Sequence, residues 1–205
     1  MIRRYIGDRT ESALSFLARA LHRRGISPNA LTLTGLAINL GAAWAYFKGA
    51  WVAGGLIVLF AGIFDMLDGA VARAGGRASA IGAFVDSVVD RYSDGIVFGG
   101  LLAHFVVLGQ VKGALLTLAV LFGSFLVSYV RARAELVIPR CDVGLMERPE
   151  RLILLVAGSL FGFLETALWL LAVLTHLTAF RRIRYTLTSA PGATRPDTPT
   201  PPPNA

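Results

Sequence analysis

The sequence predicts an all-α integral membrane protein with six transmembrane helices preceded by an amphipathic juxtamembrane helix. Hydrophobic residues make up 55% of the 205 residues and charged residues only 16%, a balance that is typical of membrane proteins. Long apolar runs alternate with short connections, and the basic residues gather in those connections. The length fits one helical bundle rather than several domains.

Residues 1–27 predict a helix that lies on the membrane surface. Leu14, Leu17 and Leu21 recur at helical spacing beside Ala18, with arginines on the opposite face. The stretch lacks the continuous apolar core of a cleavable signal peptide. A soluble surface helix is the alternative, but a hydrophobic span follows at once, which favours a helix whose arginines lie near anionic headgroups.

Six apolar runs follow, and about 20 helical residues are needed to cross the hydrocarbon core. The runs cover residues 31–47, 51–72, 80–108, 113–134, 148–164 and 166–181. The last two could form one bent helix or two spans broken near Gly162 and Glu165. Two spans return Arg181, Arg182 and Arg184 to the side of the N-terminal arginines, so we expect two.

The distribution of charge predicts the orientation and the domains. Nearly all arginines fall on the N-terminal side, and Lys48, Lys112 and Glu165 mark the other side, so we expect both termini to be cytoplasmic in a cell (inner) membrane protein. This placement argues against a nucleic-acid partner, and the single cysteine excludes an intrachain disulfide. The predicted units are a juxtamembrane helix (1–27), a membrane domain (28–185) and a disordered Pro- and Thr-rich tail (186–205).

Four aspartates interrupt this apolar sequence. Asp65 and Asp68 end the second run, Asp86 and Asp90 begin the third, and residues 74–79 connect them. Helical spacing places each pair on one face, and a tight loop makes the two helices neighbours, so the carboxylates converge. Buried carboxylates are costly without a strong counter-charge, and oxygen ligands suit Mg²⁺, Mn²⁺ or Ca²⁺. Two ions held in this way suggest phosphate chemistry.

The small residues beside the aspartates leave room for a ligand. Gly69, Ala72 and Gly82 lack bulk, and Arg73 lies one helical turn beyond Gly69, where it could bind a phosphate oxygen. The alternative is that the glycines only allow close helix packing and that Arg73 only anchors a helix end. The combination of spaced elements favours the ligand site.

One more acidic residue, Asp94, lies a helical turn inward from Asp90. We expect it to be a hydrogen-bonding partner, for example of Arg91, rather than a metal ligand. Acidic residues stop there and the outer halves of the runs are apolar, which disfavours a cation transporter. A silent lipid-binding scaffold is a further alternative, but it would not need an intact acidic cluster.

The spacing D-x2-D-G-x2-A-R-x8-G-x3-D-x3-D, from Asp65 to Asp90, resembles the signature of the CDP-alcohol phosphotransferase family. The resemblance implies six transmembrane helices after a juxtamembrane helix, a homodimer, and transfer of a substituted phosphate from a CDP-linked donor to an alcohol with release of CMP. It implies that Asp65, Asp68 and Asp86 are metal ligands. Asp90 would face the metals and act as the general base.

The same resemblance implies a donor site near the start of the first span. The stretch from Ser27 to Thr32 resembles the family's segment there, although Asn29 and Thr32 could instead cap a helix. The residues implied to line the CDP site are Asn29, Thr32, Asp68, Gly69, Ala72, Arg73 and Gly82.

The second half of the chain predicts the acceptor. Residues 128–135 and 147–152 resemble the bacterial phosphatidylinositol phosphate synthases, especially the actinobacterial type, in which a basic pocket holds the phosphate of inositol phosphate. Guanidinium groups bind phosphate bidentately, and the candidates are Arg131, Arg148, Arg151 and Arg182. Those synthases often have lysine in place of Arg131. The alternative is that these arginines only set topology and pair with Glu147 and Glu150.

The predicted reaction is therefore metal-dependent transfer of the phosphatidyl group of CDP-diacylglycerol to a phosphorylated polyol. Inositol phosphate is the first choice of acceptor, and glycerol 3-phosphate is the alternative. The predicted cofactors are Mg²⁺ or Mn²⁺, two ions per site.

Overall fold

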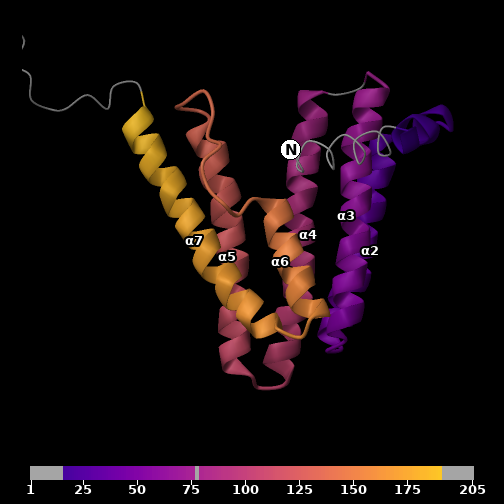
Figure 1. Cartoon of the computed structure of the whole chain (residues 1–205). Helices are drawn as coiled ribbons and strands as arrows, with labels where there is room; N and C mark the ends of the chain where they lie inside the picture. The colour runs from indigo at the N-terminus through magenta and orange to yellow at the C-terminus, as the bar shows by residue number, and fades with distance from the viewer. Residues whose placement is uncertain (1–15, 77–78, 191–205) are drawn as a thin grey trace, which may run out of the picture.

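The computed structural model describes residues 16–76 and 79–190, which form a helical bundle without strands (Figure 1). A helical stretch at residues 16–23 comes first. The helices that follow are α2 (Pro28–Phe47), α3 (Trp51–Ala74), α4 (Ala80–Val107), α5 (Val111–Ala134), α6 (Arg148–Leu160) and α7 (Leu164–Ser189).

The helices form two groups. Helix α2 packs against α3 and α4, and α7 packs against α5 and α6. Contacts of α4 with α5 and of α3 with α6 join the groups. Figure 1 shows that the groups diverge toward the end of the molecule where α3 ends and α4 begins, and meet at the opposite end.

Short turns close that opposite end. Gly49, Gly109 and Gly162 have φ values of 75°, 67° and 77° there, a left-handed conformation that glycine adopts without steric cost. The turn at Gly162 separates α6 from α7, so the last two apolar runs are two helices, as predicted.

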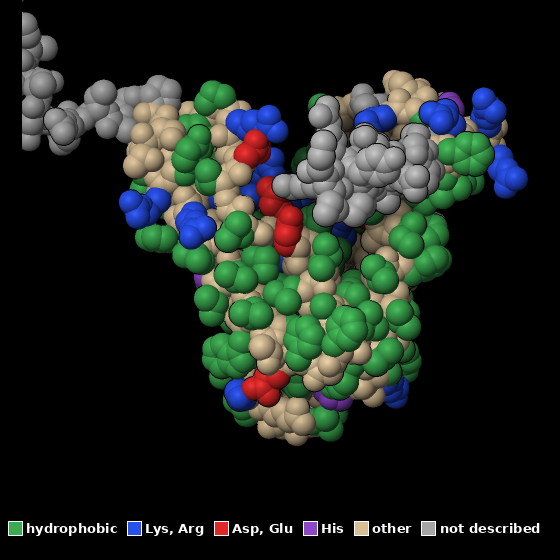
Figure 2. Space-filling view, viewed as in Figure 1, with side chains coloured by type: hydrophobic (Ala, Val, Ile, Leu, Met, Phe, Trp, Pro, Cys, Tyr) green, Lys and Arg blue, Asp and Glu red, His purple; other side chains and the backbone are tan. Residues whose placement is uncertain are grey.

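The described helices identify the chain as a membrane protein. Three of them, α2, α3 and α5, are long and apolar enough to cross a bilayer. The prediction of six spans is therefore confirmed only in part. Helix α4 carries charged residues of the site, and α6 has only 13 residues. That length gives about 20 Å of helix against a hydrocarbon core of about 30 Å. Figure 2 shows hydrophobic side chains over the middle of the molecule and many basic ones at the diverging end.

Helix α6 begins inside the bundle. The connection from α5 runs along the molecule before α6 starts, well below the end of α5 in Figure 1. Pro149 lies in the first turn of α6, where a missing N–H costs nothing. This start places the first turn of α6, with its two arginines, beside α3 and α4.

The N-terminal stretch packs on the same end of the molecule as the aspartates. Within residues 16–23, Ala18 is fully buried, and Leu21 packs with it against apolar side chains of α2 and α3. Leu17 of the predicted apolar stripe is exposed, and Leu14 lies outside the described residues. At the other terminus α7 continues to Ser189, beyond the predicted boundary at residue 185.

Candidate active site

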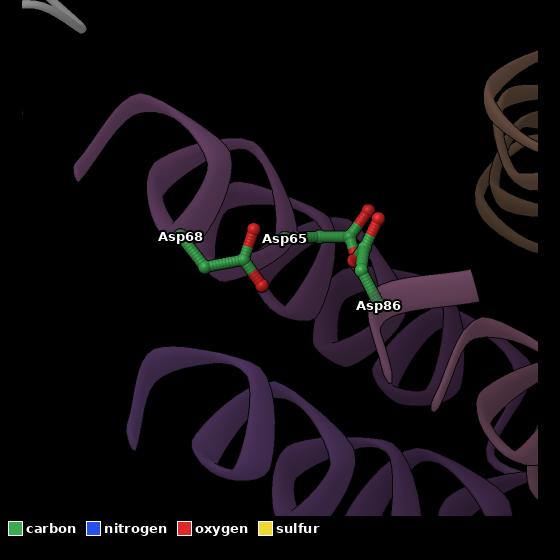
Figure 3. Close-up of side chains that lie close together, drawn as sticks. All are labelled: Asp65, Asp68 and Asp86. Atoms are coloured by element: carbon green, nitrogen blue, oxygen red, sulfur yellow. The ribbon is translucent and has the colours of Figure 1, made fainter. Parts of the chain in front are cut away.

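Three of the four predicted aspartates form one cluster (Figure 3). Asp65 and Asp68 lie in the last turns of α3, and Asp86 lies near the start of α4. One carboxylate oxygen from each lies within 4.8 Å of the other two. The predicted convergence of the two helices is therefore found.

Arg148 links Asp90 to this cluster. Its Nη1 donates a hydrogen bond of 2.5 Å to Oδ2 of Asp65 and lies 2.6 Å from Oδ1 of Asp90. That Asp90 oxygen is buried and, among the described residues, accepts no hydrogen bond of good geometry. One guanidinium thus stands between two carboxylates, and Asp90 keeps an acceptor oxygen for a further partner.

These four carboxylates fit a divalent cation. Like charges held this close in a partly buried site repel one another unless a cation balances them. Carboxylate oxygens are the ligands that Mg²⁺, Mn²⁺ and Ca²⁺ prefer. The incompletely paired oxygen of Asp90 and the close spacing of Asp65, Asp68 and Asp86 match that chemistry.

A first cavity, the α2–α3–α4 pocket, opens beside Asp68 and Asp86 and has a volume of about 500 Å³. The hydroxyl of Thr32 donates to Oδ2 of Asp68 at 2.6 Å. Ser27 caps α2 by accepting from the amide of Ala30, so Asn29 and Thr32 do not serve as its cap. The pocket is lined by all of the residues predicted for the CDP site, namely Asn29, Thr32, Asp68, Gly69, Ala72, Arg73 and Gly82.

The glycines of this pocket are not needed for helix packing. A Cβ on Gly69 would meet only Nη1 of Arg73, at 3.4 Å, and one on Gly82 would meet only Oγ of Ser79, at 3.3 Å, among the described atoms. Neither contact is with another helix. The absence of side chains at these two positions therefore opens the pocket, which favours the ligand interpretation.

A second cavity, the α4–α5–α6 pocket, has a volume of about 850 Å³. Its polar lining residues are Ser87, Asp90, Arg91, Ser128, Arg131, Glu135, Glu147, Arg148, Arg151 and Arg182. All four arginines predicted for the acceptor are among them. Of the three arginines near the end of α7, Arg182 is buried, whereas Arg181 and Arg184 are exposed.

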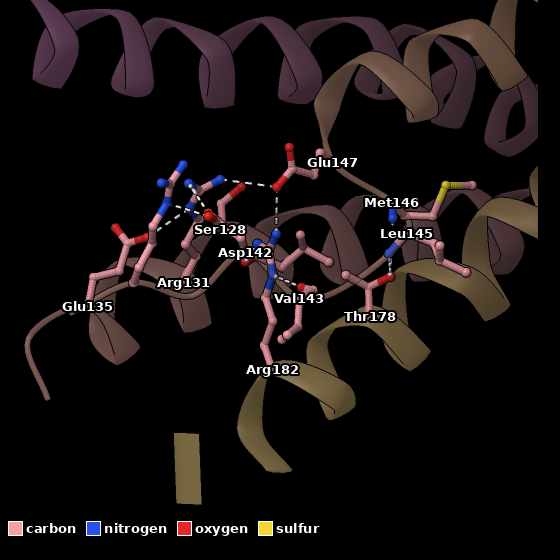
Figure 4. Close-up of polar contacts among 12 residues, drawn as sticks. Ser128, Arg131, Glu135, Asp142, Val143, Leu145, Met146, Glu147, Thr178 and Arg182 are labelled. Atoms are coloured by element: carbon pink, nitrogen blue, oxygen red, sulfur yellow. Dashed lines mark hydrogen bonds and ion pairs between the residues drawn. The ribbon is translucent and has the colours of Figure 1, made fainter. Parts of the chain in front are cut away.

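Arg131 and Arg182 meet at a single carboxylate (Figure 4). Oε1 of Glu147 lies 3.1 Å from Nη1 of Arg131 and 3.0 Å from Nη2 of Arg182. Arg131 also pairs with Glu135 and Asp142. The predicted pairing with Glu147 is present, but in a pocket-lining cluster rather than at an isolated helix end.

Arg151 pairs with Asp94 in the interior. Nη2 of Arg151 donates to Oδ2 of Asp94 at 2.7 Å, and the two side chains are 2% and 3% exposed. Asp94 is thus a hydrogen-bonding partner, as expected, but of Arg151 and not of Arg91, which instead donates to Ser128 at 2.7 Å. The reason is the start of α6 inside the bundle, which brings Arg151 to Asp94.

A third cavity, the α3–α6 groove, is apolar and has a volume of about 480 Å³. Apolar side chains of α3 and α6 line most of it, and Asp65, Asp90 and Arg148 border it. The three cavities therefore meet at the four aspartates. Sequence reasoning missed Arg91 and Ser128 as pocket residues, although Ser128 lies within the stretch that was singled out for the acceptor.

The sequence matches known proteins over most of its length. The family model described as CDP-alcohol phosphatidyltransferase matches residues 25–181. A phosphatidylinositol phosphate synthase of Mycobacterium marinum is 44% identical over 87% of this chain and 80% of its own. An archaetidylinositol phosphate synthase of Methanothermobacter thermautotrophicus is 39% identical over 87% of this chain and 96% of its own.

Solved structures of a related enzyme are also similar to this chain over most of its length. The crystal structure of Mycobacterium tuberculosis phosphatidylinositol phosphate synthase with CDP-DAG bound has a TM-score of 0.78 and 35% identity, and the match covers 90% of this chain and 98% of that one. The structure of the same enzyme with manganese and citrate has a TM-score of 0.79 and 35% identity, covering 90% and 93%.

Proposed function

This chain belongs to the CDP-alcohol phosphatidyltransferase family, and we propose that it transfers the phosphatidyl group of CDP-diacylglycerol to inositol phosphate. The products are phosphatidylinositol phosphate and CMP. The observation that carries this proposal is the meeting of three cavities of different character at four aspartates. Family membership rules out the transporter and silent-scaffold alternatives as the main function.

The donor binds in the α2–α3–α4 pocket, with its acyl chains directed toward lipid. The small residues Gly69 and Gly82 let the cytidine approach the backbones of α3 and α4, and Arg73 contacts a phosphate oxygen. The α3–α6 groove is apolar and ends at Asp65, so it suits an acyl chain of the same donor. Support for a CDP-linked lipid comes from the similar structure with CDP-DAG bound.

Asp65, Asp68, Asp86 and Asp90 hold the divalent metal on which the family depends. Two ions, Mg²⁺ or Mn²⁺, would neutralise the diphosphate and stabilise the departing CMP when bound. Support comes from the close carboxylate spacing and from the similar structure in complex with manganese. The hydroxyl of Thr32 orients Asp68 through its hydrogen bond.

Asp90 is the proposed general base. An alcohol is a weak nucleophile at neutral pH and needs a positioned base. The acceptor hydroxyl gives its proton to Asp90 and its oxygen forms a bond to the phosphorus that carries diacylglycerol, while the bond from that phosphorus to CMP breaks. Asp90 suits this role because it alone of the four aspartates borders the α4–α5–α6 pocket.

The acceptor binds in the α4–α5–α6 pocket through its phosphate. Arg131, Arg148, Arg151 and Arg182 supply the guanidinium groups. The pocket lining carries five arginines against three carboxylates, and this positive excess suits a phosphate better than an uncharged hydroxyl. The names of the relatives agree on inositol phosphate and differ in the lipid part, phosphatidyl or archaetidyl, which supports inositol phosphate over glycerol 3-phosphate.

In the membrane, α2 to α7 provide six crossings and residues 1–27 lie on the cytoplasmic surface. Both termini and the aspartates face the cytoplasm of the cell (inner) membrane. The catalytic domain begins at residue 28 and extends to the end of α7 at Ser189, and the enzyme works as a homodimer. The basic residues at the diverging end of the bundle support this orientation.

The test is CMP release by the purified protein in detergent with Mg²⁺ and CDP-diacylglycerol. Inositol phosphate, glycerol 3-phosphate, free inositol and serine are offered in parallel. Release with inositol phosphate alone is expected. Release with glycerol 3-phosphate instead would keep the transferase and change the acceptor, and silence with all four beside an active control synthase would contradict the proposal.

A further inference from the structure

We propose that Asp94 is a positioning residue for the acceptor phosphate, acting through Arg148 and Arg151. The inference rests on the proposed function insofar as the acceptor is phosphorylated. Asp94 lies outside the four-aspartate motif and is 3% exposed on α4. Asp94 lies behind the acceptor pocket rather than in it, so it can act on the acceptor only through the arginines that line the pocket.

The carboxylate of Asp94 binds Arg151 and lies near Arg148. Oδ2 of Asp94 accepts from Nη2 of Arg151 at 2.7 Å, and Oδ1 lies 3.6 Å from Nε of Arg148. The two arginines are three residues apart in the first turn of α6, so they project from the same face. Asp94 therefore anchors Arg151 through a hydrogen bond and attracts Arg148, whose Nη1 also contacts Asp65 and Asp90.

Asp94 acts from behind the arginines. Arg148 and Arg151 line the α4–α5–α6 pocket, whereas Asp94 is not among the residues that line it. Among the described residues, Asp94 is the one acidic side chain that pairs with Arg151, whose Nη1 donates to the carbonyl of Met146. A phosphate in the pocket would thus bind guanidinium groups that are already fixed by contacts on the side away from the pocket.

This arrangement lowers the cost of binding an anion. A free arginine side chain loses rotamer freedom when it binds a ligand, and one that is held beforehand loses less. Arg131 and Arg182 differ, because their shared partner Glu147 is half exposed and itself lines the pocket.

The central variant is Asp94→Asn, which removes the charge and keeps the volume. We expect the KM for inositol phosphate to rise about tenfold, because Arg151 loses its anchoring carboxylate and Arg148 loses one of the three carboxylates near it, while kcat and the KM for CDP-diacylglycerol change by less than about threefold. Asp94→Glu keeps the charge on a longer side chain and should give an intermediate KM. Glu165→Gln breaks an exposed ion pair at the opposite end of the molecule and should leave all three constants unchanged.

Two readouts separate positioning from a purely structural role. Calorimetric binding of inositol phosphate to donor-free protein should weaken in Asp94→Asn, whereas Mn²⁺ binding, followed by electron paramagnetic resonance, should stay near that of wild type. Gel filtration and thermal unfolding in detergent report whether each variant folds. If Asp94→Asn does not fold, Asp94→Glu decides: a selective rise in the acceptor KM supports the proposal, and a wild-type KM overturns it.

The failure of this proposal can be told from failure of the proposed function. Wild-type protein is tested first, and use of free inositol but not of a phosphorylated acceptor would overturn both. If wild type turns over glycerol 3-phosphate instead, the variants are compared with that acceptor. An active wild type whose Asp94→Asn variant keeps its acceptor KM, or loses kcat and both KM values alike, would overturn the positioning role alone.

Discussion

At the scale of single residues, Arg148 supplies positive charge to two of the four aspartates. Its Nη1 contacts both Asp65 and Asp90, and the side chain is only 11% exposed. A divalent ion that uses either carboxylate has to compete with this guanidinium for the same oxygens. The arginine and the metal are therefore linked, and the strength of the link can be measured.

The first prediction concerns Arg148→Ala. Removing a competing charge-assisted contact worth roughly 1.5 kcal/mol should tighten Mn²⁺ binding about tenfold, as followed by electron paramagnetic resonance. The KM for the phosphorylated acceptor should rise in the same variant. Arg148→Lys, which keeps the charge, should bind Mn²⁺ more weakly than Arg148→Ala. Unchanged or weaker Mn²⁺ binding in the alanine variant would show that no competition exists.

The second prediction concerns Asp90→Asn. If Asp90 is the base, CMP release should fall by at least about a hundredfold, the usual contribution of a positioned base. Binding of CDP-diacylglycerol and the unfolding temperature should stay close to those of wild type. Near-normal turnover would remove the base assignment while leaving the family membership intact.

The motif residues could be predicted because they lie in one continuous stretch. Helical spacing and a tight loop were enough to bring Asp65, Asp68 and Asp86 together. The partner of Asp94 could not be predicted in this way. The sequence pattern suggests only Arg91, on the same helix, whereas the contact with Arg151 depends on the depth at which α6 begins.

At the scale of helices, glycines on α3 and α4 have opposite roles. Gly69 faces a pocket, and a Cβ there would meet only the flexible end of Arg73. Gly100 faces α2, and a Cβ there would lie 2.3 Å from the carbonyl oxygen of Ala43. The same substitution should therefore affect ligand binding at one position and folding at the other.

The third prediction compares Gly69→Ala with Gly100→Ala. Gly69→Ala should keep the unfolding temperature and raise the KM for CDP-diacylglycerol. Gly100→Ala should lower stability by about 1–3 kcal/mol, the usual cost of overpacking, and the measurement is thermal unfolding in detergent. A stable Gly100→Ala variant, or a Gly69→Ala variant with wild-type donor KM, would contradict this division.

The helices themselves could be predicted from the apolar runs, including the break between α6 and α7. The depth at which each helix begins within the bundle could not be predicted. Residues 135–147 carry no hydrophobic period that reveals how far the chain enters the bundle, and the 13 residues of α6 were expected to be a longer run. That depth determines where Arg148 and Arg151 lie, so the acceptor pocket is the part of the site that needed the structure.

At the scale of the whole molecule, charge differs between the two ends. Lys112 and Glu165 pair at the end with the short turns, whereas Arg140 lies on the connection that follows the other end of α5. Each of the two basic side chains is well exposed, at 68% and 79%. They are therefore suitable positions for a test of orientation.

The fourth prediction uses single cysteines in a Cys141→Ala background, since Cys141 is the one native cysteine. A maleimide that does not cross membranes should label Lys112→Cys in intact cells with an accessible inner membrane. Arg140→Cys should be labelled only after permeabilisation, because the proposed orientation places it in the cytoplasm. The cysteine-free parent is the control, and the reverse pattern would invert the topology.

Asp90, Arg148 and Pro149 border both the polar α4–α5–α6 pocket and the apolar α3–α6 groove. A water-soluble reactant and a lipid therefore reach the same few side chains from two different cavities. An inhibitor built from a short phosphorylated head and one hydrocarbon tail would cover this border and exclude both substrates at once. Its potency would depend on the length of the linker between head and tail, because this linker has to match the separation of the two cavities.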